Sequence, residues 1–180
     1  MKLIKTQLDG LFIIDPDVFR DDRGYFFESY NWDKFLNLGL DLTFVQDNES
    51  KSGKGVLRGL HFQAPPYQQG KLVRVVKGAV LDMAVDLRKN SPTYGKWEGV
   101  ELSEQNKRMY WIPPGFAHGF LTLEDDTVFF YKCTAAYNKD SERSLAWNDP
   151  DLDIQWGIHD PVLSERDQQS PLFSSFNTPF

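Results

Sequence analysis

The stretch that decides the fold class is KLVRVVKGAVLDMAVDL, residues 71–87. If its second half is extended, successive side chains point to opposite faces, and one face carries only apolar residues: Ala79, Leu81, Met83, Val85 and Leu87. The other face carries Asp82 and Asp86 between small apolar residues, which is typical of a half-buried strand. Lys77-Gly78 is a turn signal, so we expect residues 71–76 and 79–87 to form an antiparallel hairpin.

Similar apolar runs, separated by Gly, Pro, Asn and Asp, recur along the rest of the chain. We expect further strands at residues 11–14, 24–30, 43–48, 55–63, 96–102, 108–112, 119–123 and 127–134. About nine or ten strands without a repeat period favour a β-sandwich or barrel. Helix is the minority element: Asn31 is a candidate cap for a short helix ending near Gly39, and Ser164 for a final turn containing Asp167. The last segment, residues 170–180, suits an irregular tail packed on a surface.

Composition limits the classes of function. With 180 residues, the chain can bury one sizeable core, so we expect a single domain over residues 1–180. The net charge of -6 argues against a nucleic-acid partner, because phosphate backbones are held mainly by Lys and Arg. No apolar run is long enough to cross a membrane. Cys133 is the only cysteine, which excludes an internal disulfide and fits a cytoplasmic location best.

His61 lies in LRGLHFQ, residues 57–63. One interpretation is a buried histidine of a β core. The other is a general base, because imidazole titrates near neutrality and can take up a proton without a cofactor. Strict alternation places His61 on one face with Leu57, Gly59 and Gln63. The glycine leaves room beside the ring, so we expect His61 to point into a cavity.

A metal site is a weaker interpretation. Small β-barrels often bind a metal through a His-x-His pair, a carboxylate and a later histidine, but here Gln63 stands at the second position of the pair. The other histidines are His118, in PPGFAHGF, and His159, in a polar segment typical of a surface loop. Cys133 lies in an apolar strand, and no nucleophile elbow or phosphate-binding glycine motif is present. Proton transfer is the chemistry that remains.

Tyr131 is a candidate acid, because an extended chain places it on one face with Phe129 and Cys133. The alternative is a tyrosine of the core. A phenol opposite an imidazole across a cavity could protonate the face of a carbanion that the imidazole did not attack. That arrangement inverts a stereocentre.

Three basic side chains lie near these motifs. For Arg74 we prefer a solvated strand edge, whereas Arg58 and Lys71 suit pyrophosphate binding and stabilisation of an enolate oxygen. Strict alternation places Arg58 and His61 on opposite faces. Both therefore reach one site only if a bulge, expected at Gly59, shifts the phase of the strand.

Motifs from one end of the chain to the other carry a specific resemblance. In order they are FRDDRGYF (19–26), QDN (46–48), RGLHFQ (58–63), QGKLVRV (69–75), DLR (86–88), SPTYG (91–95), WIPPGFAHGF (111–120), YK (131–132), WNDP (147–150) and LSERD (163–167). Together they resemble the dTDP-4-dehydrorhamnose 3,5-epimerase family. The resemblance implies an all-β, cupin-type jelly roll with a few short helices.

The resemblance also implies an isomerase without a cofactor or metal. It would invert carbons 3 and 5, which flank the ketone of dTDP-4-dehydro-6-deoxy-glucose, and give dTDP-4-dehydro-L-rhamnose. His61 would be the base, Asp167 the acceptor that orients its ring, and Tyr131 the acid. Lys71 would stabilise the enolate. Because a neutral imidazole is needed, we expect activity to fall as the pH drops through the titration of such a group, at about 6.5 for a free imidazole.

Binding roles follow from the same resemblance. Arg58 and His118 would bind near the sugar or the phosphates, and Tyr137 would stack on thymine. Arg166 stands where the family often has Lys, which changes the hydrogen-bond shape of that contact. The family works as a homodimer, in which Arg23 and Glu28 would serve the site of the other chain. Residues at nucleotide- or sugar-contacting positions are Arg23, Glu28, Gln46, Asn48 and Glu142.

Three alternatives stay open. The first is an epimerase that inverts only one carbon of a related dTDP-4-keto sugar. The second is a metal-dependent cupin enzyme. The third is a sugar-nucleotide-binding module without turnover.

Overall fold

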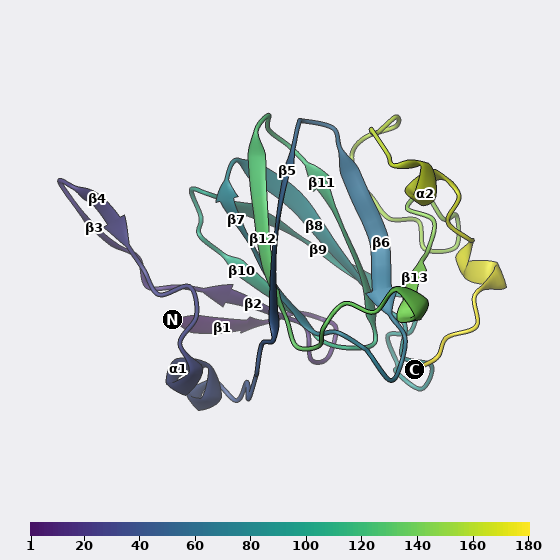
Figure 1. Ribbon diagram of the computed structural model, residues 1–180, viewed down its shortest axis with the longest axis horizontal. Coiled ribbons are helices and arrows are strands. Elements are labelled where there is room, and N and C mark those ends of the chain that lie inside the picture. Colours follow the sequence, from purple (N-terminus) through teal and green to yellow (C-terminus); the bar gives the residue numbers. More distant parts are fainter.

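A computed structural model describes all 180 residues, and in it two antiparallel sheets face each other (Figure 1). The six-stranded sheet has the order β1-β2-β10-β7-β12-β5, and the five-stranded sheet has the order β13-β6-β11-β8-β9. The expected all-β sandwich is therefore confirmed. The strand bounds are β1 Lys2–Lys5, β2 Phe12–Asp15, β5 Gln46–Ser52, β6 Leu57–Gln63, β7 Lys71–Lys77, β8 Ala79–Asp86, β9 Trp97–Ser103, β10 Met109–Ile112, β11 Phe116–Thr122, β12 Thr127–Cys133 and β13 Glu142–Ser144.

The remaining elements lie around the sandwich. A hairpin of β3 (Phe19–Asp21) and β4 (Gly24–Phe26) projects away from it (Figure 1). Helix α1 (Trp32–Asn37) is capped by Asn31 and helix α2 (Glu165–Gln168) by Ser164, as expected. Two short 3-10 helices are η1 (Lys139–Ser141) and η2 (Phe173–Ser175). None of the helices has the length and apolar character needed to cross a membrane.

The expected hairpin between β7 and β8 is wrong. β7 pairs with β10 and β12, whereas β8 pairs with β9 and β11, so Lys77-Gly78 carries the chain from one sheet to the other. Gly78 has a φ of 78°, and a Cβ there would lie 2.3 Å from Oγ1 of Thr127. A glycine turn serves a hairpin and a corner between sheets equally well, so local alternation does not reveal which sheet the next strand joins.

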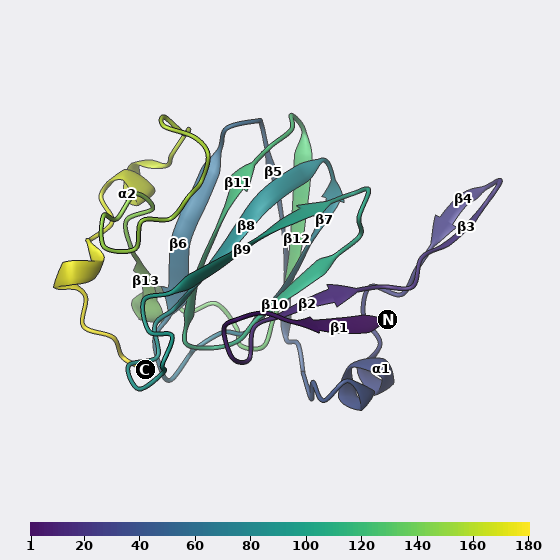
Figure 2. The ribbon, with the colours of Figure 1, turned by 180° about the vertical axis from the view of Figure 1, so that it is seen from behind.

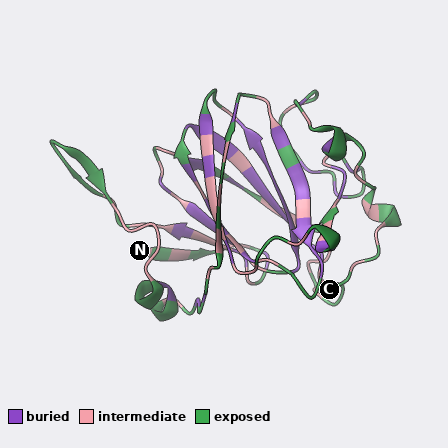
Figure 3. Ribbon diagram, viewed as in Figure 1, coloured by how far each residue is buried: buried purple, intermediate pink, exposed green.

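β8 is also buried on both faces rather than on one. Its residues Val80 and Ala84 lie in the core between the sheets, whereas Met83 and Val85 lie in a second core on the outer face of the five-stranded sheet. The segment after β13 covers that outer face (Figure 2). Buried residues therefore run along both sheets, while the β3–β4 hairpin is exposed (Figure 3). The aromatic side chains of the irregular C-terminal tail that pack on the second core are Phe173, Phe176 and Phe180.

β6 has the expected break at Gly59. In its pairing with β11, His61 lies opposite His118 and Arg58 lies opposite Phe120, so two residues of β6 face the single residue between those partners. Gly59 has a φ of 139°, and a Cβ there would lie 2.5 Å from the Cα atom of β11 that it faces. Only glycine fits that conformation and that distance.

The break moves side chains to new faces. Arg58 and His61 both line the same cavity, as the sequence interpretation required. Leu57 packs with Leu60 and Phe62 in the second core and also borders the cavity that His61 lines, so the expectation that it shares a face with His61 is met only in part. The shift of phase at the bulge accounts for both outcomes.

Arg74 does not lie at a strand edge. Its strand, β7, is flanked by β10 and β12, and the guanidinium carbon lies 5.7 Å from the ring centre of Phe27 and 5.4 Å from that of Phe130. Cation–π contacts of this kind allow a partly buried arginine on a central strand. The interpretation of Arg74 as a solvated edge residue is therefore wrong.

Candidate active site

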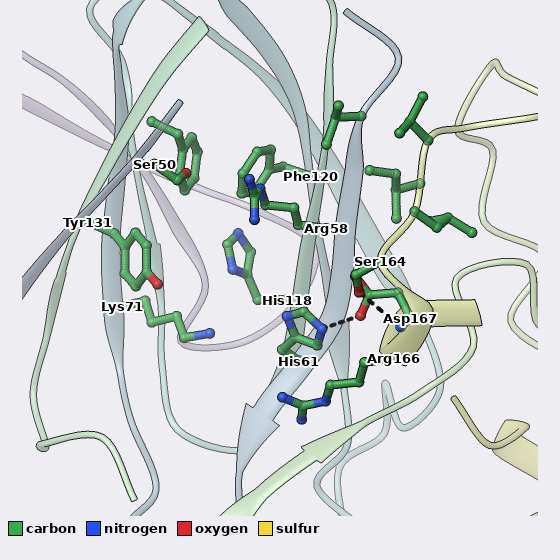
Figure 4. A pocket seen from close by; sticks show the side chains of 15 residues that line it. Ser50, Arg58, His61, Lys71, His118, Phe120, Tyr131, Ser164, Arg166 and Asp167 are labelled. Carbon is green, nitrogen blue, oxygen red and sulfur yellow. Dashed lines mark hydrogen bonds and ion pairs between the residues drawn. The ribbon is translucent and has the colours of Figure 1, made fainter. Parts of the chain in front are cut away.

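A cavity of about 430 Å³ opens between the two sheets beside α2 (Figure 4). A second hollow of about 290 Å³ shares His61, Lys71 and Tyr131 with it, so the two make one continuous site. The polar residues of the larger part are Ser50, Arg58, His61, Lys71, His118, Tyr131, Ser164, Arg166 and Asp167. Those that the smaller part adds are Gln46, Asn48, Gln63, Gln69, Tyr137 and Glu142.

His61 and Asp167 form a hydrogen-bonded pair on one wall. Nε2 of His61 lies 2.5 Å from Oδ1 of Asp167, whose side chain is 4% exposed. Helix α2 holds the carboxylate in place, because Oγ of Ser164 accepts the backbone N–H of Asp167. Burial acts to raise the pKa of Asp167, but the hydrogen bond and the charge of His61 outweigh it and the pKa is lowered. An ionised Asp167 accepts a hydrogen bond from Nε2–H, which leaves the lone pair of Nδ1 of His61 free to accept a proton.

Tyr131 and Lys71 come from the opposite sheet. β12 and β7 are paired neighbours, and Nζ of Lys71 lies 6.0 Å from the ring centre of Tyr131. Both side chains point into the cavity that His61 enters from the other wall (Figure 4). Burial raises the pKa of Tyr131 and lowers the pKa of Lys71. Tyr131 therefore carries its proton at neutral pH and can donate it.

Two more basic groups line the larger part of the cavity. Arg58 donates from Nε to Oγ of Ser52 at 3.2 Å, which leaves its terminal nitrogens free for a ligand. His118 is buried, and its Nε2 lies 3.0 Å from each carboxylate oxygen of Asp82. Arg58 and His118 thus line the same cavity as His61, and the binding roles expected of them stay predictions.

The mouth of the smaller part is a polar network. The phenol of Tyr137 donates to Oε2 of Glu142 at 2.8 Å, and Nη1 of Arg166 lies 2.6 Å from the same oxygen. The backbone N–H of Tyr137 donates to Oε1 of Gln46, whose amide donates to Asn48. Tyr137 is 54% exposed, so its ring is available to a flat ligand. Five expected binding residues thus meet here.

Arg23 and Glu28 lie outside this cavity. Arg23 is in the β3–β4 hairpin, where it pairs with Asp21, and its side chain is 90% exposed (Figure 1). Glu28 is engaged near α1 by Lys34 and by the amide of Asn31. Within one chain, neither residue reaches His61.

Several site residues escaped the sequence interpretation, although alternation could have found most of them. Ser50 continues the period of two set by Gln46 and Asn48, and Phe120 does the same after His118. Asp82 gave only a weak signal, as a charge inside an apolar strand. The chain has no group of three or more His, Cys, Asp or Glu side chains placed to hold a metal ion.

Comparison with known proteins identifies the family. The family model described as dTDP-4-dehydrorhamnose 3,5-epimerase matches residues 5–175. The chain belongs to this family. A relative from Shigella flexneri named dTDP-4-dehydrorhamnose 3,5-epimerase is 54% identical over 168 residues, which is 93% of each chain.

Solved structures of such epimerases share the fold. The crystal structure of the enzyme from Elizabethkingia anophelis NUHP1 is 54% identical, with a TM-score of 0.92 over 97% of both chains. The dTDP-6-deoxy-D-glucose-3,5-epimerase from Legionella pneumophila Philadelphia 1, solved with dTDP-4-keto-L-rhamnose, is 48% identical. Its TM-score is 0.93 over 98% of this chain and 94% of that one. The cupin-type jelly roll expected from the resemblance agrees with these neighbours.

Proposed function

We propose that this chain is an epimerase that inverts carbons 3 and 5 of dTDP-4-dehydro-6-deoxy-glucose and gives dTDP-4-dehydro-L-rhamnose. The observation that carries the proposal is the placement of an imidazole–carboxylate pair, His61 and Asp167, across one cavity from the phenol of Tyr131. Membership of the epimerase family supports the substrate class. The bound dTDP-4-keto-L-rhamnose in the Legionella relative supports the product.

Proton abstraction is the first step. A C–H bond beside a ketone is a weak acid, and its proton is removed at a useful rate only if the enolate is stabilised as it forms. Nδ1 of His61 takes the proton, and the electron pair of the C–H bond moves onto the ketone oxygen. The ammonium group of Lys71 faces that oxygen from the other sheet and balances its charge. Asp167 stabilises the imidazolium that results.

Reprotonation from the other face completes the inversion. The electron pair returns from the oxygen to the carbon, which takes the proton of the Tyr131 hydroxyl. His61 gives its proton to solvent, and the tyrosinate takes one back, so the enzyme is restored without a redox step. The same groups serve both carbons in turn, because both flank one ketone.

Nucleotide binding follows from the charges around the cavity. The guanidinium groups of Arg58 and Arg166 bind the pyrophosphate, and thymine stacks on the exposed ring of Tyr137. The amides of Gln46 and Asn48 border the same opening. Arg166 would exchange its partner Glu142 for phosphate when the substrate binds.

We also propose a homodimer of one-domain chains in the cytoplasm. The β3–β4 hairpin extends away from the sandwich with Arg23 near its tip, which suits contact with a second chain (Figure 1). The C-terminal segment packs on the same sandwich as the strands, which supports a single domain. Mass measured in solution, together with restoration of activity in mixed Arg23→Ala and His61→Asn dimers, would test the shared site.

The test of the function is the reaction in heavy water. Deuterium at both carbons that flank the ketone supports the proposal, whereas deuterium at one carbon supports the single-position epimerase. Binding of the substrate without exchange would indicate a binding module. A stoichiometric metal whose removal stops the exchange would indicate a metal-dependent cupin.

A further inference from the structure

A second imidazole–carboxylate pair lies deeper in the same cavity. Asp82 projects from β8 and is 0% exposed, and His118 projects from the neighbouring β11, with its side chain 7% exposed. Nε2 of His118 lies 3.0 Å from both carboxylate oxygens, and no other side chain hydrogen-bonds Asp82. The family resemblance assigned a role to His118 but none to Asp82.

An apolar residue would fill the position of Asp82 at lower cost. Burial of a carboxylate costs several kcal/mol unless charges and hydrogen bonds compensate for it. Here the neighbours along β8 are core residues, Val80 and Ala84. The compensation comes from the cavity side, where His118 donates to Asp82 and the charge of Lys71 acts on it. Asp82 is therefore tied to the two groups that face the ligand.

The geometry determines which nitrogen of His118 faces the ligand. Because Nε2 is engaged by Asp82, Nδ1 is the atom left to meet a molecule in the cavity, which His118 lines (Figure 4). Burial lowers the pKa of His118 and so favours its neutral form. A neutral imidazole with its proton on Nε2 has a lone pair on Nδ1. It accepts a hydrogen bond there, and a sugar hydroxyl is the group that donates one.

The balance of charge involves Lys71 as well. Its ammonium group is buried, and burial lowers its pKa, while the negative charge of Asp82 acts in the opposite direction. Burial also raises the pKa of Asp82, which the hydrogen bond from His118 and the charge of Lys71 oppose. With Lys71 charged, Asp82 ionised and His118 neutral, the three charges sum to zero, so the trio adds no net charge to the buried site. The titratable and charged groups around this trio are Arg58, His61, Tyr110, Tyr131, Cys133 and Glu142.

We infer that Asp82 is a positioning residue of the epimerisation site. It holds His118 as the Nε2–H tautomer, so that Nδ1 accepts a hydrogen bond from a hydroxyl of the sugar. It also supplies the counter-charge that keeps Lys71 charged beside the ketone oxygen. The inference rests on the proposed function, because an enolate-forming enzyme is what needs that charge.

The tautomer is tested on the unaltered protein. Nitrogen NMR of histidine-labelled enzyme at pH 7, with the signals assigned through His118→Gln, should give a protonated Nε2 and an unprotonated Nδ1 for His118. A proton on Nδ1 would overturn the inference, whether or not Nε2 also carries one. This measurement needs no variant of Asp82 to fold.

The charge is tested with Asp82→Asn, which keeps the shape of the side chain and removes its charge. We expect kcat for deuterium exchange to fall roughly tenfold or more, with KM little changed. The alkaline limb of kcat should move to lower pH, because Lys71 loses one of the negative charges that, with those of Cys133 and Glu142, favour its protonated form. The inference would be contradicted if Asp82→Asn had the kcat of the unaltered enzyme and if its kcat fell at the same alkaline pH.

Asp86→Asn is the matched control. Asp86 is also a buried carboxylate of β8, but it bonds Arg88, Ser91 and Thr93 outside the cavity. The fall of kcat at high pH should occur at the same pH in Asp86→Asn as in the unaltered enzyme, even if the variant is less stable. Binding of dTDP by each variant reports folding. If the unaltered protein itself catalyses no exchange, the proposed function fails, and that result is distinct from a normal Asp82→Asn variant.

Discussion

Nε2 of His61 and Oδ1 of Asp167 lie 2.5 Å apart, although 106 positions separate the two residues in the sequence. The bond joins a strand of the five-stranded sheet to a short helix near the C-terminus. It fixes the ring so that Nδ1 is the free nitrogen. The division of labour between this pair and Tyr131, on the opposite sheet, leads to the following predictions.

Tyr131→Phe should separate the two halves of the reaction. Without the phenol, reprotonation from the far face fails, but His61 still removes protons and returns them to the same face. We expect inversion to fall roughly a hundredfold or more, while exchange of the substrate protons with heavy water falls less. Exchange and product are measured together by NMR. Loss of both to the same extent would assign Tyr131 another role.

The pH dependence should reveal Lys71. Burial lowers its pKa, so its charged form is lost at a lower pH than that of a free lysine, whose value is 10.5. Activity should therefore decline on the alkaline side below that value. Burial raises the pKa of Tyr131, so the acid keeps its proton through the same range. In Tyr131→Phe, kcat should still fall at high pH. If that fall disappears, the group that titrates there is Tyr131 and not Lys71.

Gln63→Ala should weaken nucleotide binding without changing the chemistry. Gln63 is buried, and its side-chain amide holds the segment that carries Tyr137. Its Nε2 donates to the carbonyls of Tyr67 and Ala136, and its Oε1 accepts the backbone N–H of Asn138. Without these bonds the segment is free to move the ring of Tyr137, on which we propose that thymine stacks, so KM should rise roughly tenfold while kcat stays within about twofold. Gln155→Ala, at an exposed glutamine that bonds only Asp153, is the control. A kcat effect at unchanged KM would contradict this role.

Gly59→Ala should cost both stability and activity. A Cβ at Gly59 would lie 2.5 Å from Cα of Gly119, whereas a Cβ at Gly157 would meet nothing within 4 Å, although both glycines have positive φ. Gly157→Ala should cost about 1 kcal/mol in the free energy of unfolding, and Gly59→Ala at least about 2 kcal/mol more. Denaturant unfolding measures the difference. Equal costs would show that β6 can relax around the added methyl group.

Much of the fold could be predicted because the apolar alternation is local. Most strands appear where the pattern predicts them, and Asn31 and Ser164 cap the N-termini of the expected helices. β5 was misplaced, since its sequence QDNESKS is polar. The reason is functional: Gln46, Asn48 and Ser50 face the cavity instead of a core. Pairing partners were not predictable, because the turn at Gly78 does not record which sheet follows it.

The site could be predicted for a different reason. The motifs around His61, Tyr131 and Asp167 resemble a family, and the resemblance supplied pairs that no local pattern contains. Strand phase alone put Arg58 and His61 on opposite faces, and the conflict correctly pointed to a bulge at Gly59. Asp82 was missed because a single charge in an apolar strand does not indicate a role, and its partner His118 is adjacent only in the folded structure.

The proposed mechanism requires His61 to act as the base at both carbons. His61→Asn, incubated with dTDP-4-dehydro-6-deoxy-glucose in heavy water, should still bind dTDP but should lose deuterium uptake at carbons 3 and 5 together, by about a thousandfold or more. His159→Asn, at an exposed histidine, should exchange both positions at the normal rate. Uptake at either carbon at the normal rate in the His61 variant would contradict the mechanism.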